Sequence, residues 1–201
     1  MKNILALATA LGVVLMAAPS HAQNGTPIRI RGTIDAVNGS TLDVTSRTGE
    51  KVSVALAPDA TVVLIAPAKI TDIKSGSFIG TAAMPQSDGS LKALEVQVFP
   101  ESMRGTGEGQ RDYDLQPQST MTNATAYDVV GTNGRDLTLK WQGKETKLTV
   151  PPDVPIITYE KGDRTMLKPG AHVIVNGTKG ANGTPVAMRV AVGKDGLMPP
   201  M

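Results

Sequence analysis

The chain has 201 residues, with 20 Lys and Arg against 18 Asp and Glu, a formal net charge of +2 and no cysteine. Because this balance is close to neutral and the basic residues are scattered, the sequence lacks the basic stripe typical of nucleic-acid-binding proteins. The absence of cysteine excludes disulfides, thiolate metal sites and cysteine nucleophiles. Aromatic residues make up only 3% of the chain, so we expect a core of Val, Ile, Leu and Ala.

The N-terminal segment is predicted to be a secretory signal peptide over residues 1–22. A short positive region is followed by an uncharged apolar run over 4–18 and by a small-x-small cleavage site that ends at Ala22. The apolar run is short for a membrane span. We therefore predict cleavage after Ala22, a periplasmic or secreted protein and no membrane span in the mature chain. The alternative is an uncleaved membrane anchor.

The mature chain is predicted to be a tandem repeat. Asp59 corresponds to Asp153, an offset of 94 residues, and the same offset carries through most of the two halves. Matches concentrated at apolar and turn positions are what two copies of one fold would retain. Further matches at this offset or close to it pair Ile73 with Leu167, Gly76 with Gly170, Gly89 with Gly183, Val96 with Val190, Val98 with Val192, Asp35 with Asp128 and Leu42 with Leu137.

Each copy is predicted to consist of short strands. Residues 28–34 alternate apolar and polar side chains, which indicates a half-buried strand, and Asn38-Gly39 is a typical tight-turn dipeptide. Short strands separated by glycine-rich turns favour an all-β barrel or sandwich. A copy of roughly 70 residues is small for an independent domain, so we expect the copies to bury a shared face. The predicted strands are 28–34, 42–44, 52–56, 61–65, 78–82, 91–98, 125–130, 137–141, 144–150, 156–159, 172–176 and 186–192.

The repeated motifs resemble the bacterial domain of unknown function 5666. The pattern runs through Gly32-Thr-Ile34-Asp-Ala-Val37, Ile73-Lys-Ser-Gly76 and Asp88-Gly89 to Ala93 and Val96; the second copy has Asp128-Val-Val130, Leu167-Lys-Pro-Gly170 and Asn182-Gly183 to Ala187 and Val190. The resemblance covers both copies and not the segment between them. It implies exported proteins built from small β-barrels similar to oligonucleotide-binding folds, without an agreed activity.

We therefore expect two tandem, small, OB-like or SH3-like β-barrels joined by a long glycine-rich loop. The predicted boundaries are 1–22 for the signal peptide, 23–99 for the first barrel, 100–123 for the connecting loop, 124–193 for the second barrel and 194–201 for a C-terminal tail.

The connecting loop over 100–123 shows neither strand nor helix periodicity, and Gly105, Gly107 and Gly109 alternate through it. A nucleotide-binding loop would need a helix to follow, and no helical pattern follows here. Glycines that are flexible, or that form left-handed turns and fold the loop onto the barrels, explain the spacing better. The loop concentrates polar side chains, and its candidate ligand-binding residues are Glu101, Arg104, Glu108, Arg111, Asp112 and Tyr113.

Two further kinds of site are considered. Met103 and Met121 are candidate thioether ligands for copper, with His172 and the loop carboxylates as additional ligands. Paired carboxylates such as Glu108 and Asp112 are candidates for hydrolytic acid–base chemistry. The mature chain has a single histidine and no HExxH motif, so a classical zinc site or a Ser-His-Asp triad is difficult to assemble. His172 corresponds to Phe78 in the first copy and is expected to be a partly buried strand residue.

The sequence therefore favours an exported, non-catalytic binding or interaction module with no cofactor, whose partner is a protein or small ligand of the periplasm and not a nucleic acid. The alternative is a periplasmic accessory protein that handles copper.

Overall fold

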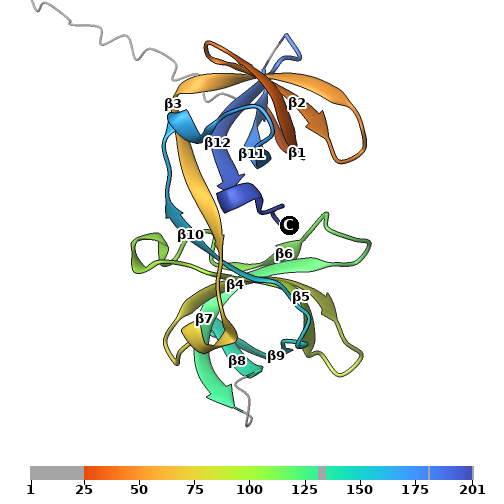
Figure 1. Ribbon diagram of the computed structural model, residues 1–201. Helices are drawn as coiled ribbons and strands as arrows, with labels where there is room; N and C mark the ends of the chain where they lie inside the picture. Colours follow the sequence, from red (N-terminus) through yellow and green to blue (C-terminus); the bar gives the residue numbers. More distant parts are fainter. Residues whose placement is uncertain (1–24, 131–134, 181, 201) are drawn as a thin grey trace, which may run out of the picture.

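The computed structural model describes residues 25–130, 135–180 and 182–200, so the predicted signal peptide lies outside the described part. Within these ranges the protein is all-β, as predicted, and contains a closed five-stranded β-barrel (Figure 1). The helical elements found there are short 3-10 turns, and none is long and apolar enough to cross a membrane.

Most strands agree with the predicted ones in position and are generally longer. The strands are β1 (Thr26–Asn38), β2 (Thr41–Ser46), β3 (Lys51–Pro67), β4 (Phe78–Pro85), β5 (Leu91–Val98), β6 (Gly109–Asp112), β7 (Thr120–Val130), β8 (Asp136–Trp141), β9 (Lys144–Thr149), β10 (Ile156–Lys161), β11 (His172–Lys179) and β12 (Pro185–Gly193). Two predictions are wrong: the strands expected at 52–56 and 61–65 are one continuous strand, β3, and β6 lies in the segment predicted to be a loop. The 3-10 turns are η1 (Ile70–Asp72), η2 (Glu101–Met103), η3 (Arg164–Met166) and η4 (Lys194–Gly196).

Strand pairing closes two rings, which lie one above the other in Figure 1. Ring 1 contains β1, β2, β3, β11 and β12, and the parallel pairing of β12 with β3 closes it. Ring 2 contains β4, β5, β7, β8 and β9, and a short parallel pairing of β5 with β9 closes it. Strand β3 runs from ring 1 toward ring 2, and β10 lies between β3 and β5, so the rings belong to one continuous sheet.

The expectation of one barrel for each sequence copy is not confirmed. Ring 1 takes β1, β2 and β3 from the first copy and β11 and β12 from the second, whereas ring 2 takes β4 and β5 from the first copy and β7, β8 and β9 from the second. The two copies have exchanged their last two strands. The exchange is possible because β3 and β10 carry the chain from one ring to the other: Ile73, after β3, packs in the ring 2 cluster, and Leu167, after β10, packs in the ring 1 cluster.

Most pairings have a counterpart in the other ring, as an internal repeat would give, and the exception is the pairing of β6 with β7. Arg31 lies opposite Ile174 in ring 1, and Asn123 lies opposite Gly80 in ring 2. A bulge between Ile34 and Ala36 corresponds to one between Ala126 and Asp128. This makes Ala36, not Asp35, the counterpart of Asp128, one residue away from the predicted alignment.

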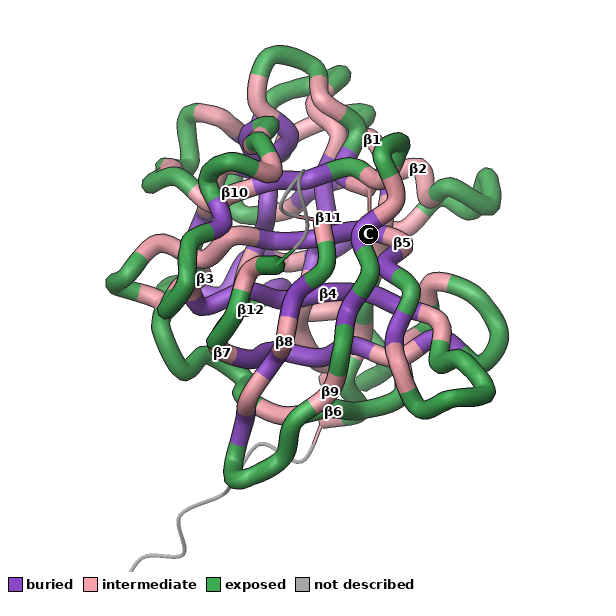
Figure 2. Tube along the Cα trace, turned by 90° about the horizontal axis from the view of Figure 1, so that it is seen from below, coloured by how far each residue is buried: buried purple, intermediate pink, exposed green. Residues whose placement is uncertain are grey.

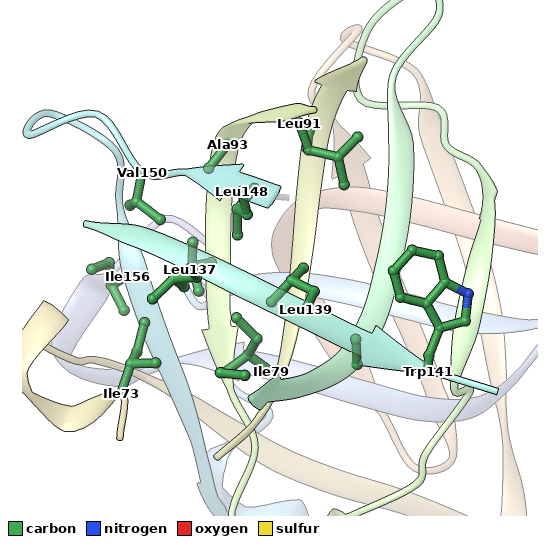
Figure 3. Packing of buried hydrophobic residues seen from close by; sticks show 14 residues of the cluster. Ile73, Ile79, Leu91, Ala93, Leu137, Leu139, Trp141, Leu148, Val150 and Ile156 are labelled. Atoms are coloured by element: carbon green, nitrogen blue, oxygen red, sulfur yellow. The ribbon is translucent and has the colours of Figure 1, made fainter. Parts of the chain in front are cut away.

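Each ring has its own apolar core, formed by the side chains that alternate inward along its strands. Ring 1 encloses a cluster that includes Leu42, Val54 and Val190. Ring 2 encloses a cluster that includes Leu139 and Trp141, and Figure 3 shows its side chains converging. Buried segments alternate with exposed turns over the whole molecule (Figure 2). Valine, isoleucine, leucine and alanine dominate these interiors, as the composition predicts.

The segment 100–123 is more ordered than the predicted loop. It contains η2 and β6, and it ends inside β7. Gly105, Gly107 and Gly109 have φ angles of 80°, 56° and 125°, so they occupy the left-handed region that favours glycine. These turns fold the segment back so that β6 pairs with β7, where Gly109 lies opposite Asn123. Of the two explanations of the glycine spacing, left-handed turns are the one that the structure bears out.

Candidate functional site

A cavity of 270 Å³ lies where the outer surfaces of the two rings meet, and the segment around β6 forms one of its edges. Arginine, aromatic and amide side chains dominate its wall. The described residues that line it are Arg29, Gln97, Phe99, Thr106, Arg111, Tyr113, Met121, Asn123, Tyr159, Ile174, Asn176, Arg189 and Ala191.

Strand alternation explains why these side chains meet. In β5, Val96 faces the core of ring 2, and Glu95 and Gln97 therefore face the opposite side. In β12, Val190 faces the core of ring 1, and Arg189 consequently faces outward. The outward faces of the two rings pack against each other through a third apolar cluster. Its members are Ile65, Ala82, Met121, Ile157, Ile174 and Ala191.

At this junction, equivalent positions of the two copies have side chains that differ in charge. Arg189 of ring 1 is the counterpart of Glu95 in ring 2, since they lie opposite Asn176 and Ala82 respectively. Arg31 is likewise the counterpart of Asn123. At these two pairs of positions, ring 1 has a guanidinium group where ring 2 has a carboxyl or an amide group. The two sides of the site therefore differ in charge, although equivalent strands of the two copies form them.

One wall of the junction is a cluster of two arginines on an aromatic ring. The guanidinium carbons of Arg29 and Arg31 lie 4.7 Å and 5.7 Å from the centre of the Tyr113 ring. Both arginines bind Asp114: Nη1 of Arg29 donates to Oδ1 at 2.7 Å, and Arg31 makes a bidentate pair at 2.8 Å and 3.0 Å. The hydrogen bonds from Arg31 lower the pKa of Asp114 to about 2. Two cations thus share one carboxylate, and the cluster keeps an excess positive charge.

Arg189 lies over the ring of Tyr159 on another side of the cavity. Its guanidinium carbon lies 5.2 Å from the centre of the Tyr159 ring, and Phe99 stacks on the same tyrosine at 5.6 Å. No carboxylate of the described residues forms an ion pair with Arg189. Arg111 also faces the cavity, and its Nη1 donates to the carbonyl oxygen of Gly107 at 2.9 Å. The cavity therefore presents two guanidinium groups without a carboxylate partner in the described structure.

Asn123 supplies an unused hydrogen-bond acceptor. Its Nδ2 donates to the carbonyl oxygen of Thr106 at 2.9 Å, and this bond fixes the orientation of the amide, because a carbonyl cannot accept from Oδ1. The residue is only 4% exposed, and its Oδ1 atom is buried without a hydrogen-bond partner. Gly80 permits this arrangement, because a Cβ there would lie 2.7 Å from Oδ1 and 3.0 Å from Phe99. The Oδ1 atom is therefore buried against the backbone of Gly80 and does not open into the cavity.

Glu95 lies behind the cavity wall and is completely buried. Burial raises the pKa of its carboxyl to about 8, opposed by the hydrogen bond from Gln97 and by the charge of Arg31. The Nε2 atom of Gln97 lies 3.4 Å from Oε2 of Glu95, and the hydroxyl of Tyr159 donates to Oε1 of Gln97 at 2.6 Å. Burial also raises the pKa of Tyr159. The raised pKa values favour the uncharged forms of both groups in this network.

The structure brings two of the six predicted ligand residues, Arg111 and Tyr113, to the cavity. Glu101 and Arg104 instead pair with each other at 2.5 Å on the surface. The last two predicted residues do not line the cavity: Glu108 lies in a separate hollow beside Tyr127, Lys140 and Trp141, and Asp112 is exposed at the end of β6.

The predicted metal ligands occupy three different settings. Met103 is half-buried in η2, Met121 is buried in the cavity wall, and Nδ1 of His172 is hydrogen-bonded to the hydroxyl of Thr33 at 2.9 Å. His172 is a partly buried strand residue, as expected from its alignment with Phe78. Within the described ranges, no group of three or more His, Asp or Glu side chains is placed to hold a metal ion.

Sequence reasoning missed most of the cavity residues because they lie on strands outside the connecting segment. A signal was present: charged or amide residues stand at outward positions of strands whose other members are almost entirely apolar, as with Glu95, Gln97 and Arg189. Comparing the two copies at those positions, where Glu95 aligns with Arg189, would have marked them as the places where the repeat diverges.

Comparison of the chain with family models, with curated proteins and with solved structures found no match.

Proposed function

We propose that this protein is an exported, non-catalytic binding module that holds a small anion in the cavity between its two rings. The observation that carries this proposal is the set of side chains that line the cavity. Arg111 and Arg189 offer guanidinium groups, and Tyr159 and Phe99 offer ring faces. Guanidinium groups bind carboxylates and phosphates with matching fork geometry.

The composition of the wall favours binding over catalysis. Among the described residues that line the cavity, none is a carboxylate, an imidazole or a thiol, the groups that most often act as general base or nucleophile. A pocket with a few convergent polar groups on an apolar wall is the usual form of a small-molecule site. Residues from both rings contribute, and the fixed packing of the rings holds these groups in place without a ligand.

We also propose an assignment for the two rings. We infer that both rings are small barrels of the oligonucleotide-binding type, related to the domain of unknown function 5666, and that the strand exchange creates the junction that serves as the binding site. The N-terminal sequence pattern supports the export of the protein.

A thermal-unfolding panel on the mature chain, residues 23–201, tests anion binding. We expect at least one of acetate, benzoate, inorganic phosphate and sulfate to raise the unfolding temperature, because a ligand that binds only the folded state stabilises it by about 2.7 kcal/mol at a hundredfold excess over its Kd. The stabilisation should largely disappear in Arg189→Gln and Arg111→Gln. Lys51→Gln, which removes one positive charge from an exposed strand end, is the matched control and should respond like the wild type.

Two results would refute the proposal. One is a panel in which no anion stabilises the wild type. The other is an equal response of the two arginine variants and the Lys51 variant, since the effect would then be general screening of positive charge.

A further inference from the structure

We infer that ring 1 binds an acidic, extended peptide segment of a partner protein as an additional strand along residues 28–31 of β1. This interaction is additional to anion binding in the cavity. It follows from a difference between two equivalent strands of the repeat: β7 has β6 beside it, whereas β1 has no described strand in the corresponding place.

The register of the two strands locates the difference. Because Arg31 is the counterpart of Asn123, residues 28–31 of β1 correspond to residues 120–123 of β7, which pair with β6. Residues 28–31 pair with β11 on one side, but on the other side the pairing with β2 begins only at Gly32. The offset of 92 residues between Arg31 and Asn123 would place the counterpart of β6 at residues 17–20, inside the predicted signal peptide and outside the described part.

The side of residues 28–31 that faces away from β11, here called the free side of β1, offers backbone hydrogen bonds. In an antiparallel sheet, alternate residues direct their N–H and C=O groups to opposite neighbours. The N–H of Ile34 donates toward β11, to the carbonyl oxygen of Ala171 at 2.9 Å. On the other side, the carbonyl oxygen of Arg31 accepts from the N–H of Arg47 at 2.8 Å. Arg29 therefore directs its N–H and C=O to the free side, where no strand of the described ranges pairs with it.

An open hollow of 370 Å³ lies along the free side of β1, so there is room for a short strand. Arg29, Ile30 and Arg31 line it from β1. The turn after β2, with Arg47, and the segment after β6, with Asp114, form its other sides.

Ring 2 shows how the turn after β2 would assist. Gln142 directly follows β8, and its Nε2 donates to the carbonyl oxygen of Glu108, the residue before β6, at 3.4 Å. Arg47 holds the equivalent position after β2, and its Nη2 donates to the carbonyl oxygen of Pro199 in the C-terminal tail. The tail does not replace the missing strand, because Pro199 and Pro200 have no N–H to donate to the carbonyl groups of β1.

The side chains of β1 determine the pattern of the added strand. Arg29 and Arg31 project from one face of β1, and Ile28 and Ile30 project from the other, where Ile30 packs against the core of ring 1. Residues directly opposite each other on adjacent strands project to the same face. The added strand should therefore alternate acidic residues, opposite the arginines, with apolar residues, opposite the isoleucines.

The charge of the hollow favours an acidic partner over a second copy of the chain. Among the described residues that line it, Arg29, Arg31 and Arg47 are cations, and Glu50 and Asp114 are the carboxylates. If the β1 strands of two copies paired about a twofold axis, their arginines would meet, and like charges directly opposite each other destabilise a sheet. An acidic segment adds the carboxylates that the three arginines lack.

Fluorescence anisotropy with three short labelled peptides tests this inference on the mature chain. The first peptide alternates glutamate and valine, the second has the same composition with the glutamates grouped at one end, and the third alternates lysine and valine. We expect the first to bind about tenfold more tightly than either of the others, because main-chain hydrogen bonds provide affinity and alternate side chains provide specificity.

Two substitutions of one residue separate the backbone from the charge. Arg29→Ala and Arg29→Pro both remove the guanidinium group, but only proline also removes the N–H on the free side, a position that proline tolerates in an edge strand. Binding of the alternating acidic peptide should weaken about two- to fivefold in Arg29→Ala and become unmeasurable in Arg29→Pro. Asp114→Asn, which removes the carboxylate that competes for both arginines, should tighten it by a similar factor. Circular dichroism of each variant confirms that it is folded.

Amide hydrogen exchange of the wild type gives a readout that needs no variant. The N–H of Arg29 should become protected when the alternating acidic peptide binds. The N–H of Ile30, which faces β11, should keep its protection unchanged and serves as the internal control.

Several results would overturn the inference: similar affinities for the three peptides, equal binding by folded Arg29→Ala and Arg29→Pro, or an Arg29 N–H that gains no protection. A wild-type dimer in sedimentation that Arg29→Pro abolishes would also overturn it, since the occupant would then be a second copy. The anion panel tests the proposed function separately, because neither Arg111 nor Arg189 lines the hollow.

Discussion

Neither sequence copy is expected to fold alone. If the chain is cut after Gln116, the first fragment keeps β1–β6 and the second keeps β7–β12. The first fragment then lacks two of the five strands of ring 1 and three of the five strands of ring 2. Open rings expose both their apolar interiors and unpaired strand edges. Since a whole domain is stable by only about 5–15 kcal/mol, such losses should leave each fragment largely unfolded.

Mixing the fragments should restore the native fold in a 1:1 complex. Trp141 reports on this event, because it belongs to the second fragment and packs in the same apolar cluster of ring 2 as Ile79 and Leu91 of the first. We expect a blue shift of tryptophan fluorescence and recovery of the β-sheet circular dichroism on mixing, with both signals saturating at equimolar ratio. The uncut chain at the same concentration is the control.

A chain of two consecutive barrels predicts the opposite behaviour. In that arrangement residues 23–99 would unfold cooperatively on their own, and adding residues 124–193 would not change their stability. Cooperative unfolding of the isolated first copy would therefore contradict the strand exchange. Fragment mixing is decisive here because the two arrangements contain nearly the same strands and differ only in which strands they pair.

The strands could be predicted from the sequence because each is a local pattern. Residues 28–34 alternate, Asn38-Gly39 and Asn182-Gly183 turn the chain, and the repeat offset supports each assignment with a second copy. The exchange could not be predicted, because equivalent strands of the two copies have the same alternation of apolar and polar residues. Either strand could therefore pair with the same neighbour. Val190 fits the interior of ring 1, and its counterpart Val96 fits that of ring 2. Only the direction in which the chain leaves β3 and β10 decides between the two pairings.

The site was predictable only in part for the same reason. Arg111 and Tyr113 lie in a segment that attracts notice through its composition, whereas Glu95, Asn123 and Arg189 lie within regular strands where no local motif marks them. The role of these three depends on a contact between the outer faces of two rings. No spacing along the chain encodes that contact, because it arises from the tertiary arrangement.

Replacing Glu95 with glutamine is expected to abolish most of the pH dependence of stability between pH 5 and pH 9. The pKa of this carboxyl is about 8 in the folded protein against an ordinary value of 4.5, because burial disfavours its charged form. Between these two values the folded protein holds a proton that the unfolded chain has lost. The free energy of unfolding of the wild type should therefore fall as pH rises through this window and level off above pH 8.

The size of this effect follows from the shift. At about 1.36 kcal/mol per pKa unit, the wild type should lose on the order of 4 kcal/mol between pH 5 and pH 9. The groups around Glu95 account for the direction: Gln97 and Tyr159 are neutral, and Arg31 is the one cation that opposes the rise in pKa. Because Arg31 is already paired with Asp114, it cannot compensate fully for the loss of water around the Glu95 carboxylate.

Urea unfolding at pH 5.5, 7.0 and 8.5 measures the effect. Glu95→Gln retains the shape of the side chain and its hydrogen bond with Gln97, so the variant should match the wild type at pH 5.5 and exceed its stability at pH 8.5. Glu145→Gln, which removes an exposed carboxylate paired with Lys140 at 3.2 Å, is the control and should retain the slope of the wild type. If Glu95→Gln also kept that slope, the carboxyl would have to be solvated in the folded protein. Water would then reach the junction between the rings, and the layer behind the cavity would not be the buried one that the proposed binding site requires.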